Sequence, residues 1–312
     1  MAEERVTLLL TCGSSAPLRI TWCYRIIQLY GTTPFRPVIA KRLVLWNSVQ
    51  PLPAAFDHFR RFNDVEILET NSSSLNNRWI GTLAHTPTFW LLNLDDDIFV
   101  SAHGIRCLVA HRSADSILGT YGRLVMESPI SKKIVYSVIR SPSAFYSMVL
   151  PRIMLLSRWH LRLYSNASTH LHQYVDDEES HSDDILMNFV VPRRLRVILP
   201  SSWIVDLDKE CSRRERSRAS WGGLGLHPNR KEMRASAGQY FARYTGWPTA
   251  SNVTAQCNET RQASKFKSTF NYASWCHDLL HHNTSQLLEG SRSTLRHTSA
   301  HSASRQLPVQ GS

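Results

Sequence analysis

Apolar residues follow two different periods along the first hundred positions. Short apolar runs typical of strands occur at residues 6–11, 42–46, 65–69 and 89–94. The run at 89–94 is too short for a helix, and its bulky side chains suit a buried strand. Between the runs, residues 18–30 carry apolar side chains at helical spacing, residues 54–62 fit a short helix and residues 77–80 fit a helical turn. This β-α-β-α-β order predicts a largely parallel sheet with helices on its faces.

The second half of the chain continues with a mixture of both patterns. The apolar spacing predicts helices at residues 102–111, 154–164, 183–191 and 231–244, and strands at residues 116–121, 134–139 and 196–199. Residues 175–182 are predicted to form an acidic loop, after which Ser182 or Asp183 caps the next helix. Beyond Pro248 polar residues dominate. We therefore expect one folded domain over residues 1–250 and a disordered tail over residues 251–312.

Composition narrows the classes of partner. The 312 residues are 42% hydrophobic, and 36 Lys and Arg residues face 25 Asp and Glu residues, which gives a formal charge of +11. Such a surplus suits a polyanionic acceptor, a nucleotide or an anionic membrane, and it suits an ordinary solvated face equally well. No basic stripe is interleaved with aromatic residues, so we expect no nucleic-acid partner.

The six cysteines and the N-terminal run bear on the cellular compartment. No CxxC pair occurs, so a structural zinc site is not expected, whereas Cys257 and Cys276 lie close enough in sequence to form a disulfide. Five N-x-S/T sequons hint at a secretory compartment. The apolar run at residues 5–10 is too short to cross a bilayer. We expect either a soluble protein or a longer product that carries an N-terminal anchor outside this sequence.

Three adjacent carboxylates, Asp95, Asp96 and Asp97, directly follow the fourth predicted strand. In open α/β sheets, ligands bind just beyond the carboxyl ends of the strands. Three like charges side by side need a cation or hydrogen-bond donors to remain ionised together. Asp95 and Asp97 provide hard oxygen ligands that suit Mn²⁺ or Mg²⁺ bound together with substrate phosphates. Taken alone, the triplet fits a solvated acidic turn equally well.

Two further stretches carry candidate chemistry. Asp183 and Asp184 begin a predicted helix, where a carboxylate can accept a hydrogen bond from a sugar hydroxyl or stabilise a developing positive charge. The same acids can equally well do no more than cap the helix. Arg234, on the last predicted helix, can serve as a bidentate donor to a diphosphate leaving group, or lie on the surface.

Together these stretches resemble the exostosin-type glycosyltransferase domain, the family of the C-terminal exostosin domain and the exostosin-like N-acetylhexosaminyltransferases. The matching motifs lie in the family's order, at Leu43–Asn47, Asn77-Arg78, Asp95–Asp97, Tyr146–Leu150, Asp183–Phe189, and Arg234 with its exit turn Gly246–Pro248. The resemblance covers roughly residues 5–250. Six motifs in a fixed order are far more specific than any single acidic pair.

The resemblance implies an α/β glycosyltransferase-A fold, with a Rossmann-like nucleotide-binding half, a mixed sheet and a smaller acceptor half over residues 1–250. It implies a metal-dependent retaining transferase that moves N-acetylglucosamine from a UDP-sugar to a glycan or glycolipid, in the lumen of the Golgi or the endoplasmic reticulum. Membrane association would then come from a segment outside this chain. The alternatives are a transferase that uses GDP-mannose and a non-catalytic sugar- or nucleotide-binding relative of the same fold.

The motif matches also imply roles for individual residues. Asp97, together with Asp95, would bind Mn²⁺ or Mg²⁺. The donor-binding residues would be Asn47, Asn77, Arg78, Asp95 and Asp96, the first three at the uridine or the diphosphate and the last two at the ribose and the sugar. The catalytic residues would be Asp184, beneath the anomeric carbon, and Arg234, facing the diphosphate or the sugar.

Several positions depart from the family pattern. Ser182 and Ala237 stand where the family often has a pair of cysteines. Pro151–Met154 replace a run of small residues near the acceptor, which leaves the acceptor open. The first turn lacks the family's nucleotide-holding aromatic and arginine, with Arg19 as the nearest substitute, so the base is open as well. The family's histidine before the final arginine aligns with His227 only through a gap.

Overall fold

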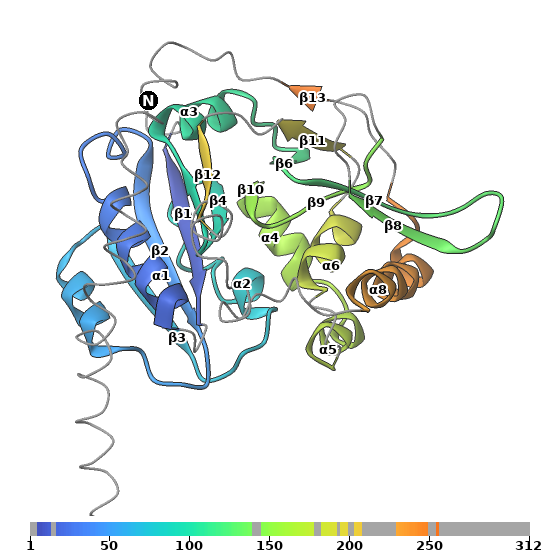
Figure 1. The fold of residues 1–312 in the computed structure, drawn as a ribbon, viewed down its shortest axis with the longest axis horizontal. Coiled ribbons are helices and arrows are strands. Elements are labelled where there is room, and N and C mark those ends of the chain that lie inside the picture. Colours follow the sequence, from blue (N-terminus) through green and yellow to red (C-terminus); the bar gives the residue numbers. More distant parts are fainter. Residues whose placement is uncertain are drawn as a thin grey trace, which may run out of the picture.

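The computed structural model describes residues 5–13, 17–138, 145–177, 182–191, 194–198, 203–207, 229–248 and 254–255. Their largest element is an eight-stranded sheet in the order β13-β11-β6-β10-β4-β1-β2-β3 (Figure 1). Four of these strands form the N-terminal half: β1 (Val6–Cys12), β2 (Ile39–Asn47), β3 (Val65–Thr70) and β4 (Trp90–Asp95). All four run parallel, which confirms the Rossmann-like half.

Helices connect these parallel strands. The connecting elements are α1 (Pro17–Tyr30), the 3-10 helix η2 (Ala54–Arg61) and the short helix α2 (Asn77–Ile80). Each lies within two residues of its predicted position, because the apolar residues of α1 and η2 have the spacing that buries one face against a sheet.

The other half of the sheet is mixed. Its strands are β6 (Ser116–Gly119), β10 (Ile153–Ser157), β11 (Arg194–Ile198) and β13 (Thr254–Ala255). Because β10 runs antiparallel to both β4 and β6, the predicted mixed sheet is confirmed. Two small sheets join it: β5 (Ile98–Val100) pairs with β12 (Ile204–Asp206), and β7 (Gly122–Glu127) pairs with β8 (Ile134–Val138) and β9 (Met148–Val149).

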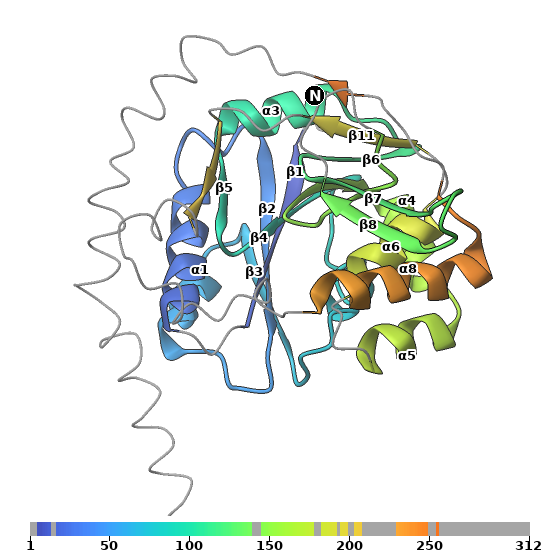
Figure 2. The ribbon, with the colours of Figure 1, turned by 45° about the vertical axis from the view of Figure 1, so that its right-hand side comes forward.

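Each face of the large sheet carries its own core. Alternate residues of a strand point to opposite faces, and in β1 the side chains of Leu8 and Leu10 join one core while that of Leu9 joins the other. The first core lies against α1 and α3 (Ala102–Ala110). The second lies against α2, α4 (Arg158–Ser165), α5 (Thr169–Asp177), α6 (Asp183–Val190) and α8 (Arg230–Thr245). Figure 2 shows α5, α6 and α8 gathered below the β7–β8 hairpin.

The helix predicted over residues 154–164 is wrong in its first part. Ile153–Ser157 form β10, a strand between β4 and β6 whose five residues are all buried, and the helix begins only at Arg158. Ser157 ends the strand and caps α4, since its side chain accepts from the His160 amide while its own amide donates to the His160 ring. A continuous apolar run predicts a buried strand and a buried helix equally well.

The acidic loop predicted over residues 175–182 is also partly wrong. Val175–Asp177 form the last turn of α5, because Leu171 and Val175 lie one turn apart and are both buried.

The sequence patterns did not predict the strand β7. At the other end of the chain, β13 pairs with β11 beyond the expected domain boundary at residue 250. Cys257, Cys276 and His227 lie outside the described residues, as does most of the predicted tail. Among the helices that are described, none combines the length and the apolar character needed to cross a bilayer.

Candidate active site

The three predicted acids lie at the carboxyl edge of the parallel strands. Thr11 of β1 pairs with Asp95 of β4, and Cys12 pairs with Trp46 of β2, so the three strands end side by side. Asp96 and Asp97 form the two-residue turn between β4 and β5. Asp96 is 5% exposed and Asp97 is 8% exposed, which rules out a solvated acidic turn.

Three arginines from different elements neutralise these acids. Arg19 of α1 lies 2.5 Å from Asp96 and 3.0 Å from Asp97. Arg78 of α2 lies 3.5 Å from Asp95. Arg152, which precedes β10, lies 3.2 Å from Asp97. The acids are thus paired with guanidinium groups that come from three separate parts of the sequence.

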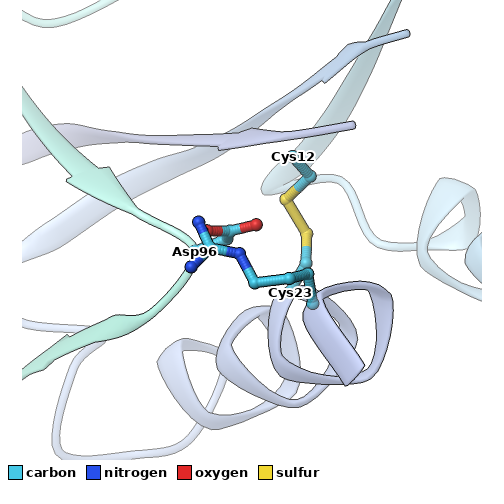
Figure 3. The surroundings of a disulfide bond; sticks show 4 residues. Cys12, Cys23 and Asp96 are labelled. Atoms are coloured by element: carbon cyan, nitrogen blue, oxygen red, sulfur yellow. A yellow bond between two sulfur atoms is a disulfide. The ribbon is translucent and has the colours of Figure 1, made fainter. Parts of the chain in front are cut away.

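A disulfide fixes the helix that carries Arg19. Cys12 at the end of β1 is bonded to Cys23 of α1, with 6.2 Å between their Cα atoms, and the bond lies close to Asp96 (Figure 3). Arg19 and Cys23 are four residues apart and therefore lie on the same face of α1. The sequence pointed to a different pair of cysteines. A disulfide is typical of proteins that fold in an oxidising compartment.

Asn47 and Asn77, which are predicted to bind the sugar-nucleotide donor, contact each other at the end of β2. The Asn77 side-chain amide donates to Asn47 Oδ1 at 2.8 Å, and the Thr70 hydroxyl donates to the same oxygen at 3.1 Å. Asn47 is 8% exposed. The end of β2 and the start of α2 are thereby joined beside Arg78.

The second acidic pair lies at the start of α6 and is buried. Asp183 accepts a hydrogen bond from the Trp79 indole at 2.9 Å and lies 3.7 Å from Arg78. Asp184 Oδ2 accepts from Arg234 Nη2 at 2.5 Å, and Arg234 is only 2% exposed. The alternative of Arg234 as a surface residue is therefore wrong. Asp183 and Asp184 do more than cap the helix, since both are bound to buried donors.

The side chain of Asn188 joins two of the family motifs, Tyr146–Leu150 and Asp183–Phe189. Asn188 Oδ1 accepts from the Val149 amide at 2.9 Å, and Asn188 Nδ2 donates to the Val149 carbonyl at 2.9 Å. The helix that carries Asp184 is thereby fixed to β9. Ser182 and Ala237, at the positions of the family's cysteine pair, are both fully buried, and their helices α6 and α8 pack together.

A basic cluster surrounds Asp184. Arg234 lies over the ring of Tyr136 at 5.1 Å. Burial is the main cause that lowers the pKa of Arg123 and of Arg230, and the positive charge of Arg234 lowers both further. Asp184 lies close enough to both arginines to raise their pKa values in turn. Among the described residues, three guanidinium groups therefore lie within electrostatic range of the Asp184 carboxylate, and that of Arg234 contacts it.

Comparison with known proteins identifies the family. The profile of the "Glycosyl transferase family 64 domain" matches residues 9–234. The chain belongs to glycosyl transferase family 64. It is 25% identical over 209 residues to "Glycosyltransferase family protein 64 C3" of Arabidopsis thaliana, a match that spans 63% of this chain and 61% of that protein. Among solved structures, a nucleotidyl transferase from Methanothermobacter thermautotroptrophicus is similar at 10% identity and a TM-score of 0.33, over 55% of this chain and 83% of that one.

Burial opposes the ionisation of several acids in this family 64 chain. Burial raises the pKa of Asp96 and the pKa of Asp183 to about 7, against the attraction of Arg19 and Arg78 respectively. Burial likewise raises the pKa of Asp95. In the described residues the carboxylates of Asp95, Asp96, Asp97 and Asp183 form ion pairs with the guanidinium groups of Arg19, Arg78 and Arg152, and Arg152 also pairs with Asp206. Burial therefore makes it unfavourable to ionise every member of this acidic cluster unless further positive charge is present.

These residues fit a divalent ion. Asp97 Oδ1 is buried and makes no hydrogen bond within the described residues, and carboxylate oxygens are the donors that Mn²⁺ and Mg²⁺ prefer. In the part of the chain that is described, no three His, Cys, Asp or Glu side chains are grouped so as to hold a metal by themselves. A site of this kind has to be completed by oxygens of the substrate, as Mg²⁺ sites in nucleotide-binding enzymes commonly are.

Asp183→Asn is expected to change how stability depends on pH. The folded-state pKa of Asp183 is about 7, above the value of about 3.9 for a free Asp. The folded chain therefore keeps a proton that the unfolded chain releases, and stability falls as pH rises from about 4 to about 7. The variant should remove part of this slope, on the order of 1 kcal/mol per pH unit, while its amide oxygen still accepts from Trp79.

The measurement is urea denaturation at several pH values between 5 and 8, with EDTA present. Asp96 should leave a residual slope in the variant, because its pKa is also raised to about 7. Asp177→Asn is the control, since Asp177 is exposed at the end of α5. Parallel curves for Asp183→Asn and the wild type would contradict the expected effect.

Proposed function

We propose that this family 64 chain is a metal-dependent retaining glycosyltransferase that moves a sugar, N-acetylglucosamine, from a UDP-sugar to a glycan or glycolipid hydroxyl. The observation that carries the proposal is the pairing of two oppositely charged clusters. In the acidic cluster, burial raises the pKa values of Asp95, Asp96 and Asp183, so added positive charge would stabilise their ionised forms. In the adjacent basic cluster Arg234 pairs with Asp184, whose charge also acts on Arg123 and Arg230. Arg78 lies close to both aspartate pairs, since the charges of Asp95 and Asp96 and those of Asp183 and Asp184 all act on it. A divalent ion bound to a diphosphate complements this distribution.

The donor's nucleotide would lie along the carboxyl edge of β1, β2 and β4. Asp97 and Asp95 would hold Mn²⁺ or Mg²⁺, which when bound stabilises the charge of a leaving diphosphate. Asn47, Asn77 and Arg78 would contact the uridine or the diphosphate, and Asp95 and Asp96 the ribose and the sugar. The contacts of Asn47, Asn77 and Arg78 support this assignment, because side chains held by neighbours are preorganised for binding.

The reaction centre would lie beside the contacting side chains of Asp184 and Arg234. The bond from the anomeric carbon to the diphosphate oxygen breaks, the acceptor's hydroxyl oxygen bonds to that carbon, and the hydroxyl proton leaves with the diphosphate. Asp184 Oδ1 is buried without a hydrogen-bond partner among the described residues, so it is available to stabilise positive charge at the anomeric carbon. Arg234, with Arg123 and Arg230 beside it, would stabilise the negative charge of the departing diphosphate.

A secretory compartment is part of the proposal. The bond between Cys12 and Cys23 supports the lumen of the Golgi or the endoplasmic reticulum, because cytosolic thiols are normally kept reduced. Assembly in that compartment is tested by trapping free thiols in cells and asking whether Cys12 and Cys23 remain protected. Labelling of both cysteines in the native protein would contradict this part of the proposal.

Binding of UDP is expected to depend on Asp97. In calorimetry with Mn²⁺ present, Asp97→Ala should weaken UDP binding by about a hundredfold, the size expected when a charge-assisted contact of about 3 kcal/mol is lost. Asp57→Ala, at an exposed site on η2, removes the same charge and should leave the affinity unchanged. Equal affinities for Asp97→Ala and the wild type would sink the metal assignment. Preferred binding of GDP over UDP would favour a GDP-sugar donor.

A further inference from the structure

Arg152 is held in the acidic cluster by three neighbours. Its guanidinium lies 3.2 Å from Asp97 Oδ1 and 3.0 Å from Asp206 Oδ2, and it stands 5.1 Å from the centre of the Tyr121 ring. The Leu207 amide donates a hydrogen bond to the Asp97 carbonyl at 2.9 Å, which brings β12 and its Asp206 beside Asp97. Arg152 therefore keeps two anchors when it releases Asp97.

The position of Arg152 has a direct electrostatic consequence. A guanidinium is charged at every pH at which proteins are folded, and Arg152 is paired with the carboxylates of Asp97 and Asp206, so it places a full positive charge at Asp97. Arg152 approaches Asp97 Oδ1, the buried oxygen that makes no hydrogen bond in the described residues. A positive charge at this oxygen stands where a divalent ion on Asp97 would have to bind, and like charges at such short range repel strongly.

We propose that Arg152 opposes the binding of a free divalent ion at Asp97, and so makes ion binding depend on the diphosphate of the donor. The inference rests on the proposed function, in which Asp97 is a metal ligand and the donor carries a diphosphate. Without a diphosphate, Arg152 neutralises Asp97. With a diphosphate beside it, the charge of Arg152 is compensated by the phosphates, and the guanidinium remains on Asp206 and Tyr121 when it leaves Asp97.

The first test is a titration of the nucleotide-free protein with Mn²⁺, followed by electron paramagnetic resonance of the unbound ion. Arg152→Gln is expected to bind Mn²⁺ at least about tenfold more tightly than the wild type, because a positive charge next to Asp97 that repels the ion is removed. Arg152→Lys keeps the charge and should stay within about threefold of the wild type, which a purely steric role of Arg152 would not produce.

A matched control separates this local effect from the net charge of the protein. Arg106→Gln, at an exposed site on α3, removes the same charge and should leave the Mn²⁺ affinity unchanged. Equal Mn²⁺ affinities for Arg152→Gln and the wild type would overturn the inference, as would the same gain in Arg106→Gln. If circular dichroism shows Arg152→Gln to be unfolded, a gain of tenfold or more in Arg152→Lys overturns it instead, and an unchanged affinity supports it.

The second test repeats the titration with diphosphates present. Pyrophosphate should raise the Mn²⁺ affinity of the wild type by at least about tenfold more than that of Arg152→Gln, once binding of Mn²⁺ by pyrophosphate itself is subtracted. An equal effect on both proteins overturns the coupling. Failure of the proposed function gives a different pattern. In that case pyrophosphate would still raise the Mn²⁺ affinity of the wild type more than that of Arg152→Gln, but UDP would raise it no further than pyrophosphate does.

Discussion

Asp184→Asn is expected to lower the hydrolysis of UDP-N-acetylglucosamine by about a thousandfold, while UDP binding stays within about threefold of the wild type. The substitution removes the negative charge that is proposed to stabilise the anomeric carbon and keeps an oxygen that accepts from Arg234. The effect should therefore fall on the rate and only weakly on the affinity, because the lost interaction is strongest in the transition state. The measurement is release of UDP from the donor with Mn²⁺ present and no acceptor added.

The control for this prediction is Asp177→Asn, an exposed carboxylate on the neighbouring helix α5. It should hydrolyse the donor at the wild-type rate. Equal rates for Asp184→Asn and the wild type would remove Asp184 from the reaction. A wild type that hydrolyses none of several sugar nucleotides, and yet binds UDP, would instead favour a non-catalytic relative of the same fold.

The sequence predicted those parts of the site that lie in contiguous motifs. Asp95–Asp97 follow a buried strand directly, and Asp184 begins a helix of regular apolar spacing, so the pattern that predicts each element also places the acid at its end. Arg234 was found through its resemblance to a family motif, and its contact with Asp184 was not predicted. Local sequence is therefore sufficient to predict a candidate site residue where that residue lies at the end of a strand or helix that the sequence also predicts.

The partners of these acids could not be predicted in the same way. Arg152, Arg123 and Asp206 are single residues on strands or loops far apart in the chain, and only the order of strands in the sheets brings them to the acids. No local period marks them. The bond between Cys12 and Cys23 is of the same kind, because it depends on how α1 packs against the end of β1. Arg152 was noted only as part of an unusual acceptor wall, while its contact with Asp97 requires β10 to be a strand.

Arg234→Met is expected to be strongly destabilising as well as inactive. Arg234 and Asp184 are both almost completely buried, and the side-chain distance between them is 2.5 Å. Removal of one partner from a buried ion pair leaves an uncompensated charge, which costs about 3–5 kcal/mol. Replacement of both partners by neutral residues avoids that cost, so the double variant Arg234→Met with Asp184→Asn should recover most of the lost stability. It should recover none of the activity, because both charges proposed to act on the donor are absent.

Urea denaturation at pH 7 measures the free energies of unfolding of the wild type and the variants. Arg243→Met, at an exposed site on the same helix, controls for the substitution itself. Two results would contradict the prediction. One is a loss of unfolding free energy below about 1 kcal/mol in Arg234→Met, and the other is a double variant that is no more stable than Arg234→Met. Either would show that Arg234 and Asp184 do not stabilise each other as a buried ion pair.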